Sequence, residues 1–487
     1  MVETEVTRSG LGGGARSRLL IPGLSIVVLT VAVLQTAVVP VLVIIAHQLN
    51  VSTVAASWAV TANLLAAAAA TPLIGRLADL HSKKRVLLIV LVIVLLGSIL
   101  AATTTSLALL IVARVLQAAS YGLYPISIAI LREELPEDRM GSAMSVLSGT
   151  LGFGGGTGLV VVGLLMSGQA GYHRVFWLTT AFTVLVIAIA VFVVPARERS
   201  STGTIDWLGA AGLAAGLSAV LLAITQGHSW GWTSPATLVC GACGLMILGA
   251  WWFWERRAAQ PLVSTEMMTR RPIMLTNLAT VFVGMGLYFA FLGLTQFVQI
   301  PHAAAGYGFG ATVLQASVVY LLPGAVTGFL VALVSGRFID RFGASPVLMV
   351  AAVAGIAGFL FIALAHDAKW QIIVASILAN AYISLGYGAL PALVVAEVDT
   401  GETGVATSMN AIARTVGSSL AAAMVAVLLG RSTNGVPMES SFVAIFFGGA
   451  VTAALAMVLI AFSRPRRTTI ESVEARYESR AMNHEWG

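Results

Sequence analysis

The sequence predicts an all-α protein that crosses a membrane fourteen times. Two observations support this fold class: 58% of the 487 residues are hydrophobic, and only 10% are charged. A soluble globular protein is about 45–50% apolar and about 25% charged, so this chain has too little polar surface to cover a water-soluble body. The composition excludes a soluble enzyme, a disordered scaffold and a nucleic-acid-binding protein. The net charge of +6 agrees with the basic loops of a membrane protein.

Long stretches without Asp, Glu, Lys or Arg give the spans in order, because each crossing requires roughly 20 mostly apolar residues. Residues 19–75 are long enough for two spans, with a turn near residues 50–52. Residues 86–113 hold the third span and open the fourth, which carries Arg114 and ends near Leu131. The later spans are predicted, in order, in residues 140–173, 175–196, 207–254 (two spans), 272–336 (two spans), 342–366, 370–396, 403–430 and 440–463.

The spans should be helices, since lipid offers no hydrogen-bond partner to the backbone and each span must satisfy its own polar groups. A membrane β-barrel would show strands of about ten residues in which apolar and polar side chains alternate. Runs such as residues 86–96 do not alternate.

Lys and Arg residues predict the orientation. They gather in one set of loops, which also includes both termini, whereas the opposite set contains only Arg174, Lys369 and Arg431. Cytoplasmic loops carry an excess of Lys and Arg. We therefore expect a multi-pass protein of the cell inner (plasma) membrane with both termini cytoplasmic. Arg16 and Arg18 precede an apolar segment that is too long for a cleaved signal peptide, so we expect the first helix to be retained.

Two loops on the predicted cytoplasmic side resemble each other. The first, residues 75–85 between spans 2 and 3, reads G-R-L-A-D-L-H-S-K-K-R. The second, residues 336–343 between spans 10 and 11, reads G-R-F-I-D-R-F-G. A duplicated G-R-x-x-D loop indicates two homologous halves. Halves that rock against each other around a midplane site are the architecture of a secondary transporter.

Further motifs strengthen this interpretation. Span 4 contains R-V-L-Q at residues 114–117, and span 5 contains a glycine-rich run at residues 149–158. By the order and spacing of these motifs, the sequence resembles the major facilitator superfamily, specifically its fourteen-span drug/proton antiporter branch, over about residues 20–463. The loop at residues 75–85 matches the inner-gate motif of that family, G-x-L-x-D-x-x-x-[RK]-x-[RK].

The resemblance implies a major-facilitator-type fold of two six-helix bundles plus two inserted linker helices, spans 7 and 8. The implied divisions are a cytoplasmic N-terminal segment (1–19), an N-terminal six-helix bundle (20–196), a linker with transmembrane helices 7 and 8 (197–271), a C-terminal six-helix bundle (272–463) and a cytoplasmic tail (464–487).

The resemblance also implies an inner gate at the repeated loops. In the first loop, Asp79 is expected to pair with cationic groups or to cap a neighbouring helix N-terminus. The alternative is a plain topology anchor, but an anchor needs no fixed G-x-x-x-D spacing. The predicted gate residues are Gly75, Arg76, Asp79, Lys83, Lys84, Arg85, Gly336, Arg337, Asp340 and Arg341.

Two charged residues, Arg114 and Arg414, lie inside predicted spans. Insertion scales assign each of them roughly 2.5–3.5 kcal/mol at the helix centre, so such residues indicate function by default. Each is expected to bind a substrate anion or to tune a proton acceptor; the alternative is an Arg satisfied by backbone carbonyls. The predicted substrate and proton pathway consists of Gln35, Asn63, Arg114, Gln117, Tyr121, Tyr124, Gln296, Tyr320, Asn380 and Arg414.

The glycine-rich run in span 5 is similar to the antiporter motif of the family. A dinucleotide-binding loop would need a preceding strand, and none is predicted here. Small residues let helices approach closely, so we expect a close-packed, bendable helix. The glycines concerned are Gly152, Gly154, Gly155, Gly156 and Gly158.

Acidic residues all fall at or beyond the ends of predicted spans, and none precedes Thr36 in span 1. If protons drive transport, the acceptor must therefore lie near a span end. The candidates are Asp206 and Glu397, at the inner ends of spans 7 and 12, where burial would raise a carboxyl pKa. The alternatives are plain interfacial carboxylates, a different coupling ion or lost coupling.

The sequence predicts a secondary active transporter that exports amphiphilic organic compounds of the drug or natural-product type by alternating access, with proton antiport. The alternatives are uptake or export of a small anionic metabolite, and a transporter-like protein without proton coupling. The expected partners are the lipid bilayer, a small amphiphilic organic substrate and protons, and no nucleic acid.

Other function classes lack the residues they need. A membrane-embedded enzyme requires a convergent nucleophile, metal or acid pair at depth, and a receptor requires a sizeable soluble domain; the sequence predicts neither. The C-x-x-C pair Cys240 and Cys243 lies in an apolar span, away from anything that would lower a thiol pKa. We expect no cofactor and no metal site.

Overall fold

The computed structural model describes residues 13–38, 41–166, 171–197, 203–430, 432–433 and 436–463. The first twelve residues of the expected N-terminal segment, and the expected tail at 464–487, lie outside the described residues. Within the described part, fourteen helices are long and apolar enough to cross a membrane. This confirms the predicted all-α fold class.

The elements follow one another in the order that the sequence predicts. The first eight helical segments and one 3₁₀ segment are α1 (Gly13–Thr36), α2 (Leu42–Gln48), α3 (Thr53–Leu80), α4 (Lys83–Thr103), α5 (Leu107–Gln117), η2 (Ala118–Gly122), α6 (Leu123–Glu134), α7 (Glu137–Leu165) and α8 (His173–Val193). The next three are α9 (Trp207–Trp230), α10 (Pro235–Glu255) and α11 (Thr265–Thr269).

The remaining elements form the second half of the chain. They are α12 (Arg271–Gln299), α13 (His302–Ala305), α14 (Val313–Gln315), the π-helical η3 (Ala316–Leu321), α15 (Leu322–Phe342), α16 (Ala344–Leu364), α17 (Lys369–Val395), η4 (Thr400–Glu402), α18 (Thr403–Leu429) and α19 (Glu439–Phe462). Before α19, β1 (Ser432–Thr433) pairs antiparallel with β2 (Val436–Pro437).

Local sequence signals set where several helices begin and end. Ser52 starts α3 by accepting a hydrogen bond from the N–H of Ala55 (3.1 Å), and Asp206 starts α9 through the N–H of Gly209 (2.8 Å). Such caps satisfy N–H groups that have no partner inside the helix. At its C-terminal end, α15 stops at Gly343, whose φ of 85° suits glycine.

Residues 19–75 contain one helix more than the two predicted spans. The short helix α2 lies between the two spanning helices α1 and α3.

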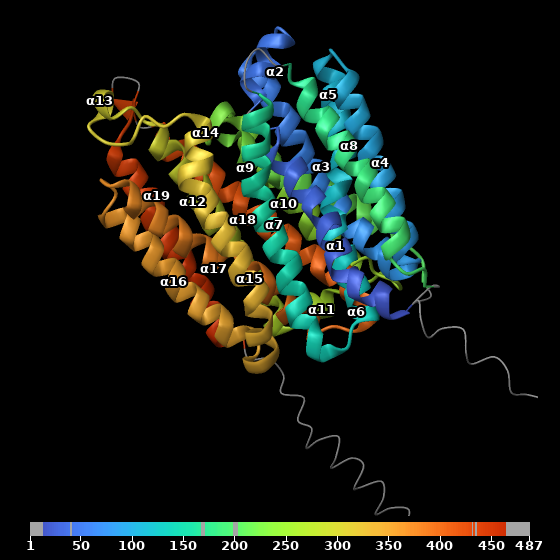
Figure 1. Cartoon of the computed structure of the whole chain (residues 1–487). Helices are drawn as coiled ribbons and strands as arrows, with labels where there is room; N and C mark the ends of the chain where they lie inside the picture. The colour runs from blue at the N-terminus through green and yellow to red at the C-terminus, as the bar shows by residue number, and fades with distance from the viewer. Residues whose placement is uncertain are drawn as a thin grey trace, which may run out of the picture.

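The helices assemble as two bundles with separate hydrophobic cores. One core draws its buried side chains almost entirely from α1 to α8, and the other draws them from α12 to α19. Figure 1 shows the first bundle in blue to green and the second in yellow to red. The two bundles meet where α7 packs against α15 and α17, and where α3 packs against α18.

The inserted pair lies across this junction. Helix α9 packs against α3 of the first bundle and against α18 of the second, and α10 packs against α9. A small core joins them to both bundles, with Leu213 and Leu217 of α9 beside Ala68 of α3 and Met409 of α18. The linker helices are therefore part of the packed body.

One end of the molecule holds the beginning of α1, the end of α3, the beginning of α18 and the end of α19 (Figure 1). We call this end the Asp79 face. Between the two ends, large apolar side chains are exposed on the outer surface, including Phe192 (77%), Leu364 (75%) and Val350 (71%). A soluble monomer rarely exposes such a surface, so lipid is its natural contact.

Close packing between α12 and α18 should be sensitive to one added methyl group. A β-carbon at Gly417 would collide with the backbone carbonyl of Val281, and neither backbone can retreat easily. We expect Gly417→Ala to destabilise the protein by about 1–3 kcal/mol, the usual cost of overpacking, and to lower the melting temperature of purified protein in detergent.

The matched control is Gly249→Ala on α10, where a β-carbon meets nothing within 4 Å. Its melting temperature should equal or exceed that of the wild type, because Ala is the better helix former. Equal melting temperatures for the two variants would contradict the packing of α12 on α18.

Candidate functional site

Asp79, near the end of α3, caps the N-terminus of α18 in the opposite bundle. The side chain is fully buried, and its carboxylate accepts hydrogen bonds from the N–H groups of Gly404 and Val405, both at 2.9 Å. These groups lie in the first turn of α18, where no intrahelical acceptor exists and the helix dipole favours a negative charge. Gly75 lies one turn earlier on the same face, and a β-carbon there would lie 2.6 Å from the carbonyl oxygen of Gly404. The G-x-x-x-D spacing thus provides both the close approach and the cap.

The second loop makes the corresponding contact in the reverse direction. Asp340, near the end of α15, accepts hydrogen bonds from the N–H (3.3 Å) and the hydroxyl of Ser142, near the start of α7. Gly336, one turn earlier, packs directly against the backbone of Ser142. Asp340 is exposed where Asp79 is buried. Each bundle therefore contributes one aspartate to a helix of the other, and the contact made by Asp79 is the better shielded from water.

The basic residues of the loops contact other partners. Lys83 is almost fully buried and pairs with Glu133 of α6, and Lys84 donates to the carbonyl oxygen of Val191 on α8 (2.7 Å). These contacts hold the first bundle together at the Asp79 face. The guanidinium of Arg341 lies 5.3 Å from the ring of Phe342, Arg85 and Arg337 are exposed, and Arg76 is half-buried.

Arg132 at the end of α6 makes a third contact between the bundles, which the sequence analysis did not single out. Its guanidinium donates to Thr403 Oγ1 (2.8 Å) and to the carbonyl oxygen of Val398 (2.6 Å). The signal available in the sequence was a basic residue at the predicted inner end of span 4. Only the fold shows that it faces the second bundle.

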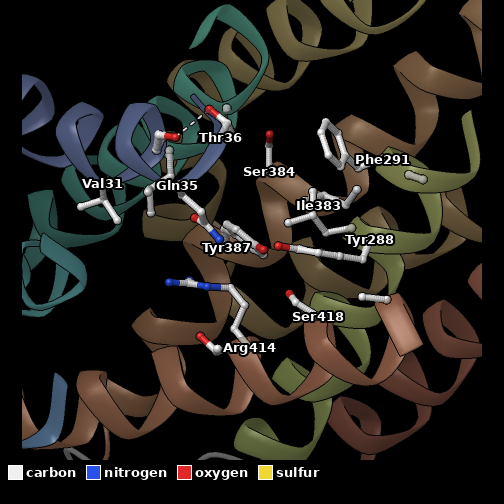
Figure 2. A pocket seen from close by; sticks show the side chains of 18 of the residues that line it. Val31, Gln35, Thr36, Tyr288, Phe291, Ile383, Ser384, Tyr387, Arg414 and Ser418 are labelled. Carbon is white, nitrogen blue, oxygen red and sulfur yellow. Dashed lines mark hydrogen bonds between the residues drawn. The ribbon is translucent and has the colours of Figure 1, made fainter. Parts of the chain in front are cut away.

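A cavity of about 200 Å³ lies between the two bundles. Its walls come from α1, α3, η2, α6 and α7 on one side, from α12, η3, α15, α17 and α18 on the other, and from Thr225 of α9. Apolar side chains such as Leu64, Leu151 and Leu294 form most of the lining. Figure 2 shows Gln35, Tyr288, Tyr387 and Arg414 projecting into it.

The structure brings five of the ten predicted pathway residues into the lining and leaves five outside it. The lining contains Gln35, Tyr121, Tyr124, Asn380 and Arg414. Outside it are Asn63, Arg114, Gln117, Gln296 and Tyr320. Of these, Gln296 is exposed on α12, and Tyr320 is buried with its ring 5.6 Å from that of Phe309.

Arg414 is the one charged residue in the lining of the cavity as described. It lies 11 residues into α18, or about 16 Å along a helix that rises 1.5 Å per residue. Its guanidinium carbon is 4.5 Å from the ring centre of Tyr387 and 5.3 Å from that of Tyr124. Both distances suit a cation–π contact, and the two rings come from opposite bundles.

The same two tyrosines are joined by hydrogen bonds. The hydroxyl of Tyr124 shares a hydrogen bond with Ser148 Oγ (2.8 Å) and donates to the carbonyl oxygen of Tyr387 (3.2 Å). Sequence analysis missed Tyr387, although it lies at i+7 from Asn380, with Ile383 and Ser384 between them at i+3 and i+4. That helical spacing places all four on one face, and all four line the cavity.

Arg114 has a different environment. It is 1% exposed, and it donates to the carbonyl oxygens of Ala59 (3.1 Å) on α3 and Leu34 (3.3 Å) on α1, and to Gln117 Oε1 (2.7 Å). Asn63 in turn donates to the carbonyl oxygen of Arg114 (2.7 Å). These contacts tie α1, α3 and α5 together, so the geometry favours the alternative of an Arg satisfied by carbonyls.

The glycine run of α7 has two faces. Gly152 and Gly155 line the cavity, whereas Gly154 and Gly158 face α1. A β-carbon at Gly158 would lie 2.7 Å from Thr36 Oγ1, and one at Gly154 would lie 2.8 Å from the β-carbon of Ala32. Small residues therefore let α7 pack directly on α1 and leave free space toward the cavity. Gly156 lies on the same helix.

The predicted proton acceptors lie far from the cavity lining. Asp206 caps α9 and also accepts from the indole N–H of Trp254 (2.7 Å), while Glu397 follows the end of α17. Glu255, which the sequence analysis did not single out, is 2% exposed and accepts from the indole N–H of Trp251 (3.0 Å). A β-carbon at Gly209 would lie 2.5 Å from Glu255 Oε1 and 2.7 Å from Asp206 Oδ2, so the two carboxylates share one small space.

No three His, Cys, Asp or Glu side chains gather to hold a metal ion in the part of the chain that the structure describes. Cys240 and Cys243 are free thiols on α10, and Cys240 Sγ contacts the carbonyl oxygen of Ala219 at 3.3 Å.

Comparison with known proteins gives a consistent result. Residues 24–207 and 205–422 match the family model of the Major Facilitator Superfamily. The chain is 30% identical over 417 residues to an uncharacterized MFS-type transporter of Mycobacterium tuberculosis, with 84% of this chain aligned. It spans 59% of the length of that relative.

Two other relatives carry functional names. The chain is 24% identical over 386 residues to the multidrug resistance protein B homolog of Mycobacterium tuberculosis, covering 77% of this chain and 69% of that protein. It is 26% identical over 400 residues to the tetracenomycin C resistance and export protein of Streptomyces glaucescens, covering 79% and 71%. Among solved structures, the human organic anion transporter MFSD10 has a similar fold, with a TM-score of 0.61 at 15% identity over 93% of this chain and 100% of that one.

The two buried arginines should respond differently to removal of their charge. In Arg114→Gln, the carbonyl oxygens of Ala59 and Leu34 lose their donor, and each such loss costs about 1–3 kcal/mol. Arg414→Gln removes contacts with two tyrosine rings and an interaction with the Tyr124 hydroxyl, and the described contacts of Arg414 include no backbone carbonyl. We therefore expect Arg114→Gln to lower the melting temperature and the yield of folded protein in detergent, and Arg414→Gln to leave both near the wild-type values. The reverse order would assign the structural role to Arg414.

Proposed function

The chain belongs to the major facilitator superfamily, and we propose that it exports amphiphilic organic compounds by alternating access in exchange for protons. The observation that carries this proposal is the position of the cavity. It lies between two bundles that hold each other at one end through Asp79 and Asp340. A largely apolar chamber with a few polar groups suits amphiphilic organic ligands.

The contacts at the Asp79 face are suited to a reversible gate. Three of them are polar contacts between separate bundles: Asp79 with α18, Asp340 with α7, and Arg132 with Thr403. When the bundles rock apart, the freed N–H groups and carboxylates would form hydrogen bonds with water instead of with each other. The closed form seen here is then one of two access states that exchange around the cavity.

Export of organic compounds is supported by two relatives whose names refer to multidrug resistance and to tetracenomycin C export. In the predicted orientation, the Asp79 face, which carries most of the basic loops, would lie in the cytoplasm of an inner-membrane protein with both termini inside. The gate residues would then close the cytoplasmic side in the form described here.

For proton coupling we propose the carboxyl pair Asp206 and Glu255 at the inner ends of α9 and α10. Glu255 is almost fully buried, and the carboxylate of Asp206 lies beside it. Both conditions disfavour a charged Glu255, so Glu255 can take up a proton. Helix α9 packs on both α3 and α18, which places the pair where bundle movement can change its surroundings. Glu397 remains the second candidate acceptor.

Loss of the Asp79 charge should stop the transport cycle and leave insertion intact. In Asp79→Asn, one of the two N–H groups of α18 loses its acceptor and meets an amide NH₂ group instead, which removes charge-assisted hydrogen bonds worth about 1.5–3 kcal/mol. We expect membrane levels like those of the wild type, and substrate efflux from cells reduced at least about tenfold.

The matched control is Asp367→Asn, an exposed position outside the transmembrane helices. It should keep wild-type efflux. Full efflux by Asp79→Asn would remove the gate assignment, and Asp340→Asn should show a smaller loss because its contact is exposed to water.

Proton coupling is tested with purified protein in vesicles. We expect dye and antibiotic transport to rise when a pH gradient is imposed and to fall when an ionophore dissipates only that gradient. Transport that is unchanged by the pH gradient would exclude proton antiport, and transport of no organic dye or antibiotic would exclude the proposed substrate class.

A further inference from the structure

We propose that the cavity selects anionic amphiphiles with an aromatic or apolar body, and that Arg414 recognises their negative charge. The inference rests on the proposed function, because it names the substrate class of the same cavity. It depends on four features of the lining: its charge, the way Arg414 is held, a hydroxyl without a partner, and the aromatic and apolar surface.

The charge of the lining is positive. Arg414 is its one charged residue, and no Asp or Glu belongs to the lining of the cavity as described. A lipophilic cation that entered would bring a second positive charge into a mostly apolar space, where repulsion is poorly screened. An anion in the same space would neutralise a guanidinium that already lies near the centre of the membrane-spanning helices. The electrostatics therefore favour anions and disfavour cations.

The guanidinium of Arg414 is held by ring faces. Tyr387 and Tyr124 contact it at 4.5 and 5.3 Å, as measured to the ring centres. The hydroxyl of Tyr124 also interacts with the guanidinium, and the remaining N–H groups lie in the guanidinium plane. Those N–H groups match the geometry of a carboxylate or sulfonate, which can accept two of them at once. Arg114 is not available for such a role, because its N–H groups already donate to carbonyl oxygens.

A neutral donor lies in the same lining. The hydroxyl of Tyr121 is buried and has no hydrogen-bond partner among the described residues. A buried polar group without a partner is costly, and an anion that accepts its hydrogen bond would remove that cost. Two donors of different kinds, one charged and one neutral, thus line one chamber.

The rest of the lining determines the body of the ligand. Phe291 and Tyr288 of α12, with Leu294 and Ile383, present aromatic and apolar surface in the same chamber as Arg414 (Figure 2). A small inorganic anion or a polar metabolite would leave this surface uncovered. The geometry fits a ligand with one acidic group and an aromatic or apolar body.

Three probes with one body test the inference: 1-pyrenebutyrate, its neutral amide and the corresponding pyrenebutyl-trimethylammonium cation. Their binding to purified protein in lipid nanodiscs is measured with empty nanodiscs subtracted, so that the result does not depend on transport. We expect the anion to bind the wild type at least about tenfold more tightly than the cation, as a charge-assisted hydrogen bond allows. Arg414→Gln should abolish the difference.

Two further variants make the comparison specific. Arg414→Lys keeps the charge and should retain part of the anion preference, and Arg257→Gln makes the same change as Arg414→Gln at an exposed site and should change nothing. If Arg414→Gln does not fold, the proposal is tested by the ratio of anion to cation affinity in the wild type and in Arg414→Lys. Equal affinity for anion and cation, no measurable anion binding, or an anion preference that survives in Arg414→Gln would each overturn the proposal.

Transport of the same probes separates this inference from the function on which it rests. Vesicles that bind pyrenebutyrate through Arg414 but do not move it would contradict the proposed export and leave the anion site standing. Vesicles that move all three probes equally, without any effect of Arg414→Gln, would support export and contradict anion selection.

Discussion

The structure depends on one requirement: a helix that begins where the two bundles meet must find acceptors for its first N–H groups. Helix α18 begins at this junction and receives Asp79 from the other bundle, whereas Asp340 contacts Ser142, the sixth residue of α7. The requirement is local, but the acceptor is not, since Asp79 and Val405 are 326 residues apart in the chain. One hydrogen-bonding need therefore fixes how α3 meets α18. In the proposed transport cycle, water would supply the same acceptors when the bundles separate.

The glycines of the repeated loops serve the same contact. Without Gly75 and Gly336, α3 could not approach α18 closely enough for Asp79 to reach its first turn, nor could α15 approach α7 for Asp340. The difference between the two sites lies in burial. Asp79 is shielded from water and Asp340 is exposed, and hydrogen bonds to a charged group are stronger where water is excluded. The duplicated motif thus gives two contacts between the bundles, a buried helix cap at Asp79 and an exposed hydrogen bond at Asp340.

The two buried arginines show how tertiary environment assigns different roles to the same residue type. Arg114 donates to carbonyl oxygens of α1 and α3, so backbone groups of the first bundle satisfy its guanidinium. Arg414 lies against two aromatic rings at the cavity, one from each bundle. The first arrangement is a structural tie, and the second places a positive charge in a chamber of otherwise uncharged lining residues. A hydropathy profile alone treats the two as the same interruption of an apolar span.

The sequence by itself determined the class, the number and order of the spans, and the two-bundle plan. The class and the spans follow from composition and from the length of charge-free stretches, because lipid allows few solutions to the backbone hydrogen-bonding problem. The two-bundle plan follows from the repeated G-R-x-x-D loop and from the resemblance to the major facilitator superfamily. The G-x-x-x-D spacing of the loops also pointed to a gate at Asp79, with either cationic groups or a helix N-terminus as its partner. The tertiary structure alone decided which helix Asp79 caps and which of Arg114 and Arg414 reaches the cavity. It also showed that Tyr387 lines the cavity, that Arg132 contacts the second bundle and that Glu255 lies beside Asp206. Those facts depend on how helices far apart in the chain rotate and pack against each other, and the apolar periodicity of a membrane helix carries little information about rotation when both lipid and protein interior are apolar.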